Sequence, residues 1–268
     1  MTSATARAAN RANAARSTGP RTRAGKAAVA RNALRHGLSL PVLADPALAA
    51  EAAALARRIA DAPNLKFCGL QAYHGRAQHL PTHQQRAQAI ASAVDAVRET
   101  LDALKAENLT CEIVAGAGTG TFAMETESGV YNELQVGSYV FMDTEYARIG
   151  NKDGGLYTAF EHSLFVLASV ISTPTAERAI VDAGLKSYSA EKGPPWVHGL
   201  DDVEVTGISD EHGKLALGPK AKRLALGEKV WLIPGHCDPT VNLHDWYVGV
   251  RHGRVEALWP IAARGAST

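Results

Sequence analysis

The stretch Pro234-Gly-His-Cys-Asp-Pro-Thr-Val-Asn-Leu-His-Asp245 follows the apolar, β-branched run Lys229-Val-Trp-Leu-Ile233 near the carboxyl end of the chain. The run predicts a strand, which the Pro-Gly pair then ends. Successive side chains of an extended backbone point to opposite faces, so we expect His236 and Asp238 to share one face and Cys237 to point to the other. An imidazole nitrogen and a carboxylate oxygen suit zinc or manganese and leave positions open for water or substrate. The alternative is that His236 and Asp238 only cap a turn and that Cys237 is a small core residue.

A second chemical feature is the glycine-rich turn Gly116-Ala-Gly-Thr-Gly-Thr121, which follows a predicted strand at residues 110–115. Backbone amides that converge where no Cβ intrudes form a concave nest for a phosphate, and threonine hydroxyls add donors. A dinucleotide-binding turn would need a third glycine at position 121 with a helix directly after it, and that position is Thr. The turn therefore indicates either a phosphate site or an ordinary tight turn.

Residues 64–150 alternate between strand and helix in the manner of an α/β barrel. Strands are predicted at residues 67–73, 110–115 and 133–143, and a long helix is predicted at residues 82–107. The helix carries one apolar face at three- and four-residue spacing, made of Ile90, Val94, Val97, Leu101 and Leu104. A complete barrel needs eight strands, so the pattern predicts only a partial barrel.

Residues 151–268 consist of short strand-like segments separated by Gly and Pro turns, which predicts a β-rich domain packed beside the barrel. Strands are expected at residues 164–172 and 175–182, and a hairpin at residues 204–213. His212 then belongs to the surface of the hairpin turn, and Lys186 is interpreted as structural. His244 is a candidate to support the metal pair without binding the ion.

The amino end has a different composition, because residues 1–44 carry eight Lys or Arg and no Asp or Glu. Residues 1–38 have almost no large apolar side chains, which predicts a disordered to weakly helical basic extension. A solvated tail is preferred here over a nucleic-acid-binding arm, and an acid-free, Arg-rich start also resembles a mitochondrial transit peptide. An amphipathic helix is expected at residues 46–62, with Asp45 as its N-cap, and the whole extension is assigned to residues 1–63.

The composition of the 268-residue chain excludes several classes of protein. A net charge of +1 argues against general nucleic-acid binding, and a hydrophobic content of 46% supports a globular protein. The three widely spaced cysteines suit a reducing cytoplasm better than a disulfide framework. No apolar run is long enough to cross a membrane. These features predict a cytoplasmic protein.

Five separated motifs resemble the D-threonine aldolase and D-serine dehydratase-like family, which has an alanine racemase-type fold and uses pyridoxal 5'-phosphate together with a divalent metal. Two of them are residues 234–243 and the turn at residues 116–121. The others are Gly69-Leu-Gln-Ala-Tyr-His-Gly75, Glu133-Leu-Gln-Val-Gly-Ser-Tyr-Val-Phe-Met-Asp143 and Trp259-Pro-Ile-Ala-Ala-Arg-Gly265. The motifs fall in family order and span roughly residues 64–268. The resemblance implies a partial (β/α) barrel followed by a C-terminal β-rich metal-binding domain.

The resemblance also implies roles for individual residues. It places a zinc or manganese ion on His236 and Asp238, and this His-x-Asp form is similar to the aldolases, whereas the dehydratases resemble His-x-Cys. The residues implied to bind the cofactor are Tyr73, Gly118, Thr119, Gly120, Gln135, Ser138 and Tyr139. Without the family, Tyr73 would be read as a barrel-rim tyrosine. His74 is a candidate acid or base, with a packed histidine as the alternative.

One expected part of the family site is not found in the sequence. The lysine that carries the cofactor in the family lies in a segment resembling Arg-Pro-His-x-Lys-Thr, at the end of the first barrel strand. Here Lys66 begins its strand and Lys26 lies in the basic head. Short motifs at residues 17–22 and 31–37 resemble the head of unrelated bacterial proteins. We therefore expect an N-terminally truncated family member fused to an unrelated basic head.

The activity implied by the resemblance is that of a lyase that cleaves a D-β-hydroxy amino acid to glycine and an aldehyde. One alternative is an inactive remnant that binds metal or phosphate without catalysis. Another is a dehydratase acting on D-serine or D-3-hydroxyaspartate. The expected partner is a small D-β-hydroxy amino acid, nucleic acid and membranes are not expected as partners, and a homo-oligomer is left open.

Overall fold

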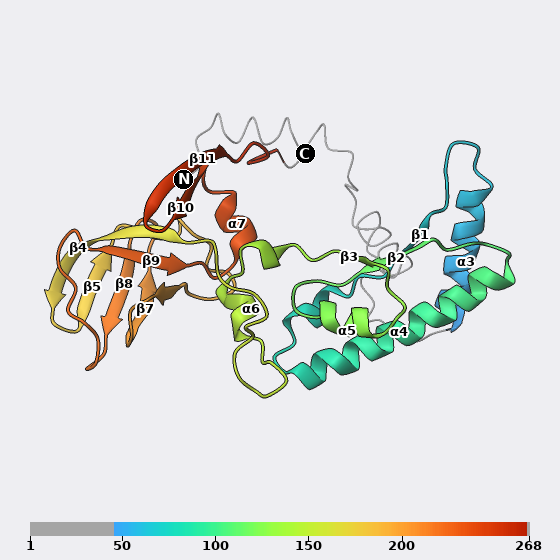
Figure 1. The fold of residues 1–268 in the computed structure, drawn as a ribbon, viewed down its shortest axis with the longest axis horizontal. Coiled ribbons are helices and arrows are strands. Elements are labelled where there is room, and N and C mark those ends of the chain that lie inside the picture. Colours follow the sequence, from blue (N-terminus) through green and yellow to red (C-terminus); the bar gives the residue numbers. More distant parts are fainter. Residues whose placement is uncertain (1–45, 267–268) are drawn as a thin grey trace, which may run out of the picture.

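The computed structural model describes residues 46–266. The described chain forms an N-terminal lobe and a β barrel at opposite ends of an elongated molecule, with two short helices between them (Figure 1). The predictions for the basic head, for Asp45 as a cap and for the fused reading frame lie outside the described residues. The division of the chain at residues 63 and 150 stays a prediction. Among residues 46–266, no helix has the length and apolarity required to cross a bilayer.

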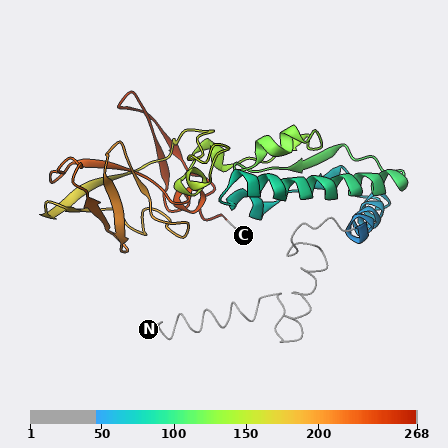
Figure 2. The same cartoon turned by 90° about the horizontal axis from the view of Figure 1, so that it is seen from below.

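The N-terminal lobe is built on a three-stranded parallel sheet of order β1-β2-β3. Its strands are β1 (Gly69–Gln71), β2 (Ile113–Gly116) and β3 (Glu133–Leu134). The connections contain the 3-10 helix η1 (Gly75–His79) and the helices α4 (His83–Ala106) and α5 (Phe122–Glu127). A preceding helix, α3 (Pro46–Ala60), packs on α4. Figure 2 shows α4 running lengthwise along the lobe.

Helix α4 confirms the periodicity seen in the sequence. It begins with a capping box, in which Thr82 accepts a hydrogen bond from the Gln85 backbone N–H and the Gln85 side chain accepts one from the Thr82 backbone. Its apolar face is buried at Ile90, Val94, Val97 and Leu104. The helix therefore covers the parallel sheet with the face that its spacing predicts.

The strand predicted at residues 133–143 is wrong beyond Leu134. The chain continues as the 3-10 helix η2 (Ser138–Val140) and then as α6 (Thr144–Arg148). Asp143 is the N-cap of α6, and its carboxylate accepts the backbone N–H of Tyr146 at 3.0 Å. The side-chain cap and the glycine at position 137 favour turns over the extended backbone that the apolar alternation suggests.

The C-terminal part is a closed antiparallel barrel of strand order β4-β5-β8-β7-β6-β9. The strands are β4 (Val166–Thr175), β5 (Arg178–Val181), β6 (Trp196–His198), β7 (Val203–Ile208), β8 (Gly213–Leu217) and β9 (Lys229–Ile233). The predicted strands at 164–172 and 229–233 and the hairpin at 204–213 are confirmed. An outer hairpin of β10 (Trp246–Arg251) and β11 (Arg254–Pro260) follows the barrel. The predicted fold class, α/β followed by β, is confirmed.

The barrel core follows from alternation, because inward side chains such as Val170, Leu215 and Leu232 are almost fully buried. We expect Leu232→Ala to lower the free energy of unfolding by about 2–5 kcal/mol, because Leu232 is fully buried and alanine would leave a cavity in the barrel core. Leu167→Ala on the paired strand β4 is the matched control, because Leu167 is 52% exposed. Its expected change is within about 0.5 kcal/mol. Urea unfolding of both variants measures the difference, and equal effects would contradict this assignment of the core.

The N-terminal lobe and the barrel are joined at α6 and α7 (Cys237–Val241), which lie between them (Figure 1). The backbone N–H groups of Thr144 and Glu145 donate to the carbonyl oxygens of Pro234 and Gly235, at 3.0 and 3.2 Å. The start of α6 is therefore hydrogen-bonded to the loop that leads into α7. This junction is where the sequence places its candidate metal ligands.

Candidate active site at the junction of the two lobes

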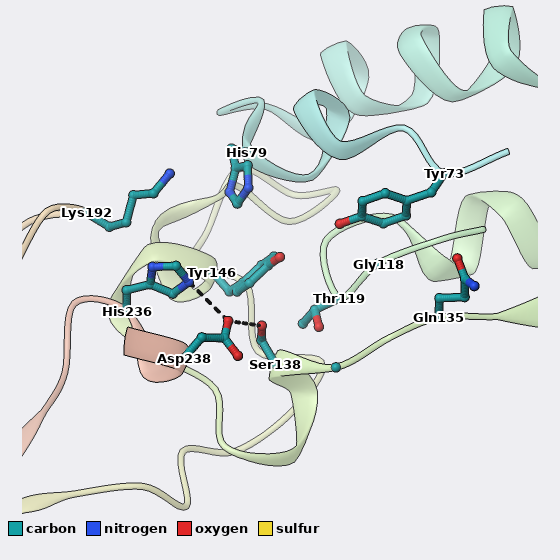
Figure 3. A pocket seen from close by; sticks show the side chains of 11 residues that line it. Tyr73, His79, Gly118, Thr119, Gln135, Ser138, Tyr146, Lys192, His236 and Asp238 are labelled. Atoms are coloured by element: carbon teal, nitrogen blue, oxygen red, sulfur yellow. Dashed lines mark hydrogen bonds and ion pairs between the residues drawn. The ribbon is translucent and has the colours of Figure 1, made fainter. Parts of the chain in front are cut away.

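A pocket of about 310 Å³ opens at the junction and draws its walls from both lobes (Figure 3). It contains these residues singled out from the sequence: Tyr73, Gly118, Thr119, Gln135, Ser138, His236 and Asp238. It also contains four residues that the sequence did not single out: His79, Gly137, Tyr146 and Lys192. The predicted residues His74, Gly120 and Tyr139 do not line it.

His236 and Asp238 face each other, with the Nε2 atom 3.1 Å from the Asp238 Oδ2 atom. The expected geometric reason is wrong, because the strand ends at Ile233 and helix α7 begins at Cys237. His236 is the extended N-cap residue of α7, and Asp238 lies in the first turn of the helix. The helical turn, not strand alternation, brings the two side chains together.

Cys237 is fully buried and does not line the pocket. Burial raises the pKa of its thiol to about 12. Its backbone N–H donates to the Oδ2 atom of Asp143 at 2.9 Å. Asp143 thus caps α6 with one oxygen and anchors the start of α7 with the other.

The imidazole of His236 lies between two carboxylates. Its Nδ1 atom is 2.5 Å from the Oε1 atom of Glu191, on the side opposite Asp238. The hydrogen bond with Asp238, followed by that with Glu191, raises the pKa of His236 to about 9. The His236 partner in turn lowers the pKa of Asp238. A metal ion bound at Nε2 would replace the proton there, while Glu191 orients the ring through the other nitrogen.

The donor set of this pair is small. Within residues 46–266, no group of three or more His, Cys, Asp or Glu side chains is arranged to hold a metal ion. The 3.1 Å between His236 Nε2 and Asp238 Oδ2 suits two ligands of one ion with metal–ligand distances of about 2.1 Å. The pair can therefore supply two ligands and leave the remaining positions to water or substrate.

The glycine-rich turn contributes Gly118 and Thr119 to the pocket. Neither backbone N–H donates to a protein acceptor in the part of the chain that the structure describes. A Cβ added at Gly118 would lie 2.5 Å from the Oε1 atom of the buried Gln78, so glycine is required for this close packing. The Gly120 N–H donates to the same Gln78 oxygen at 3.0 Å, which removes it from the set of amides open to an anion.

The side chains near the turn differ in their exposure and in their hydrogen-bond partners. Tyr73 is 44% exposed, and partial burial raises the pKa of its phenol, which therefore stays a hydrogen-bond donor at neutral pH. The Ser138 hydroxyl lies 3.5 Å from Asp238 Oδ2, and the backbone N–H of the next residue, Tyr139, donates to the Thr119 hydroxyl at 3.0 Å, so this segment joins the glycine-rich turn to the His236–Asp238 pair. Gln135 accepts a hydrogen bond from Gln71 at 2.5 Å. Tyr139 lies outside the pocket and packs its ring on Phe160.

Besides His236, the histidine that lines the pocket is His79 rather than His74, because η1 turns the chain between them and directs its last residue inward. His79 Nδ1 is 2.8 Å from the Oε1 atom of Glu145, and Lys192 Nζ is 3.1 Å from the same oxygen. Burial lowers the pKa of His79, and the Glu145 charge opposes that shift. No motif in the sequence marks this trio, which comes from three separate segments of the chain.

The other singled-out residues lie away from the pocket. Lys186 forms an exposed ion pair with Glu211 at 2.7 Å, which agrees with its structural interpretation. His212 is exposed in the turn between β7 and β8. His244 Nε2 lies 2.7 Å from the Ser187 carbonyl oxygen, and among residues 46–266 no hydrogen bond or ion pair joins its side chain to His236 or Asp238. Its supporting role stays a prediction.

Comparison with known proteins identifies both lobes. Residues 47–145 match the family described as "Alanine racemase, N-terminal domain", and residues 163–250 match "Putative serine dehydratase domain". The chain is 48% identical over 213 residues to a 3-hydroxy-D-aspartate aldolase of Paracoccus denitrificans, covering 79% of this chain and 54% of that protein. It is 47% identical over 214 residues to a D-threonine aldolase of an Arthrobacter species, covering 80% of this chain and 56% of that protein.

The crystal structure of D-threonine aldolase from Filomicrobium marinum superposes with a TM-score of 0.75 at 42% identity, covering 81% of this chain and 58% of that chain. A D-threo-3-hydroxyaspartate dehydratase from a Delftia species shares the fold, with a TM-score of 0.66 at 24% identity, over 81% of this chain and 61% of that chain. The chain spans 54% and 56% of the length of the two curated relatives. Over these matched residues, the chain belongs to the D-threonine aldolase and D-serine dehydratase-like family, with an alanine racemase-type α/β lobe and a C-terminal β-rich domain.

Proposed function

We propose that the pocket is the substrate site of a lyase that cleaves a D-β-hydroxy amino acid to glycine and an aldehyde, with pyridoxal phosphate and a divalent metal as cofactors. The observation that carries the proposal is the meeting of the His236–Asp238 pair with the glycine-rich turn in one pocket. Each feature alone has a structural explanation. Their placement in one pocket suits a substrate bound between a metal and a phosphorylated cofactor.

The polar groups that line the pocket suit pyridoxal phosphate. The amides of Gly118 and Thr119 are open to an anion and would hold the phosphate, while the Tyr73 phenol would donate to the ring. The volume of about 310 Å³ is at the small end of ligand pockets. When bound, pyridoxal phosphate supplies an electron sink for the pair released as the Cα–Cβ bond breaks.

His236 and Asp238 would hold a zinc or manganese ion, whose chemistry is to lower the pKa of a hydroxyl bound to it. Asp238 in place of a cysteine favours the aldolase over the dehydratase, by the family resemblance. Glu191 on the far side of His236 would keep the imidazole oriented toward the ion. These residues would position the β-hydroxyl of the substrate.

His79 is suited to take the proton from that hydroxyl. The Glu145 carboxylate at its Nδ1 atom favours the tautomer with a proton there, which leaves Nε2 as an acceptor. The lowered pKa keeps the ring neutral near pH 7. Removal of the hydroxyl proton lets the C–O bond become a carbonyl as the Cα–Cβ bond breaks.

The proposal is tested by incubating the purified chain with pyridoxal phosphate, Mn²⁺ and D-threonine. We expect glycine and acetaldehyde in equal amounts, and none from L-threonine. Ammonia and a keto acid instead would show a dehydratase. A protein that leaves D-threonine and 3-hydroxy-D-aspartate unchanged would refute the lyase.

A second candidate function is binding of metal or phosphate without cleavage. The observation that favours it is that Lys192, the lysine that lines the pocket, comes from the loop before β6 and is paired with Glu145. It does not lie at the end of a parallel strand, where the family resemblance puts the cofactor lysine. Borohydride reduction after loading with pyridoxal phosphate separates the two candidates, because a lysine linked to the cofactor leaves it covalently attached.

A further inference from the structure

We propose that Lys192 selects substrates that carry a carboxylate on Cβ, so that 3-hydroxy-D-aspartate is preferred over D-threonine. The inference rests on the proposed function, because it concerns the substrate of the same pocket. It deepens that function, because the fold and the metal pair are compatible with both substrates. The relatives include aldolases named for each of them at nearly equal identity, 48% and 47%.

Lys192 is held at the pocket by its backbone as well as by its side chain. Arg148 of α6 donates to the Lys192 carbonyl at 3.2 Å and to the Pro194 carbonyl at 2.9 Å. The Arg148 guanidinium also lies over the Trp196 ring, 5.2 Å from its centroid. The loop before β6 is therefore fixed to α6. Its hydrogen bonds with Arg148 hold the backbone that carries the Lys192 ammonium.

The Lys192 ammonium has N–H donors that its pair with Glu145 does not use. A lysine ammonium carries three N–H groups, and in the described part of the chain Lys192 Nζ has one acceptor, the Glu145 Oε1 atom. That oxygen also serves His79, so one carboxylate is shared by two partners. The side chain is 37% exposed. A second carboxylate can bind Lys192 without breaking the pair with Glu145.

The position of Lys192 relates it to the Cβ substituent rather than to the cofactor phosphate. Figure 3 shows Lys192 near His236 and His79, on the side away from Gly118 and Gln135. A substrate whose β-hydroxyl lies at the His236–Asp238 pair has its Cβ one bond away. The remaining Cβ group then lies within the region that Lys192 borders. A methyl group there would make no charged contact with the ammonium, whereas a carboxylate would accept one of the N–H groups that Glu145 does not use.

The test compares Lys192→Met with the parent by kcat/KM for both substrates. We expect the ratio of 3-hydroxy-D-aspartate to D-threonine to fall by about tenfold or more, because a charged hydrogen bond is lost for one substrate alone. Lys192→Arg retains a cation and should keep most of the preference. Lys186→Met is the matched control, since Lys186 forms a comparable ion pair outside the pocket, and it should keep the parent ratio.

A binding measurement tests Lys192 independently of the lyase reaction. D-malate carries a hydroxyl and two carboxylates, and D-lactate carries a hydroxyl and one. By ligand-observed NMR, we expect Lys192→Met to weaken the binding of D-malate relative to that of D-lactate. Lys186→Met should change the binding of neither ligand. A parent that cleaves nothing but shows this difference would refute the lyase and retain the carboxylate site.

Two outcomes would overturn the inference. An unchanged substrate ratio in Lys192→Met, with unchanged D-malate binding, would leave Lys192 as a structural partner of Glu145. An equal fall in kcat/KM for both substrates, with the binding of D-lactate weakened as much as that of D-malate, would place Lys192 at the carboxylate that all amino acids share.

Discussion

Replacing Asp238 by alanine is expected to lower divalent-metal affinity by more than about 100-fold, because removal of a ligand costs more than the loss of a group that only orients one. The cleavage rate should fall by about 1000-fold or more, since the metal contribution to such reactions is several kcal/mol. His236→Ala should give the same result, because the two side chains supply the pair jointly. Metal content after dialysis and the initial rate of aldehyde release measure both effects.

The matched control for this prediction is Asp245→Ala. Asp245 is an exposed carboxylate in the same segment, paired with Arg264 at 3.1 Å, and it does not line the pocket. This variant should bind metal as the parent does. Equal metal content in Asp238→Ala, His236→Ala and the parent would remove the metal site from the proposal.

Replacing Asp143 by alanine is expected to lower the free energy of unfolding by about 2–4 kcal/mol, from the loss of a helix cap and of an acceptor for a buried N–H. Asp143 is fully buried and accepts from Tyr146 and from Cys237. Because Cys237 lies between the two proposed metal ligands, His236 and Asp238, the start of α7 should shift as well. We expect metal affinity to fall by about 10–100-fold, as it does when groups that orient ligands are removed.

Asp182→Ala is the control for Asp143→Ala. The Asp182 carboxylate also accepts a backbone N–H, that of Ser169 at 2.7 Å, but it is exposed and belongs to the barrel. Its loss should cost less than about 1 kcal/mol and leave metal binding unchanged. Denaturant unfolding and metal titration of both variants provide the comparison. Parent-like metal affinity in a folded Asp143→Ala protein would show that α7 keeps its position without this anchor.

Much of the fold could be predicted from local patterns. The spacing of Ile90, Val94 and Val97 predicts a helix face that α4 buries, and β9 coincides with the apolar run at residues 229–233. These predictions hold because burial of a periodic face and β-branched alternation are properties of short segments. The strand predicted at 133–143 is wrong beyond Leu134, because its apolar alternation competes with a helix cap. The cap prevails because the Asp143 carboxylate accepts backbone N–H groups from two helices.

The sequence by itself determined the chemistry available to this protein: an imidazole and a carboxylate two residues apart, a glycine-rich turn, and five motifs in family order. Only the tertiary structure decided which groups meet. The first turn of α7 places His236 beside Asp238. The Glu145 carboxylate pairs with both His79 and Lys192, which come from separate segments of the chain. The physical reason is that the direction of a loop side chain is set by distant hydrogen bonds, such as those from Arg148 to the loop of Lys192, and these leave no periodic signal in the sequence.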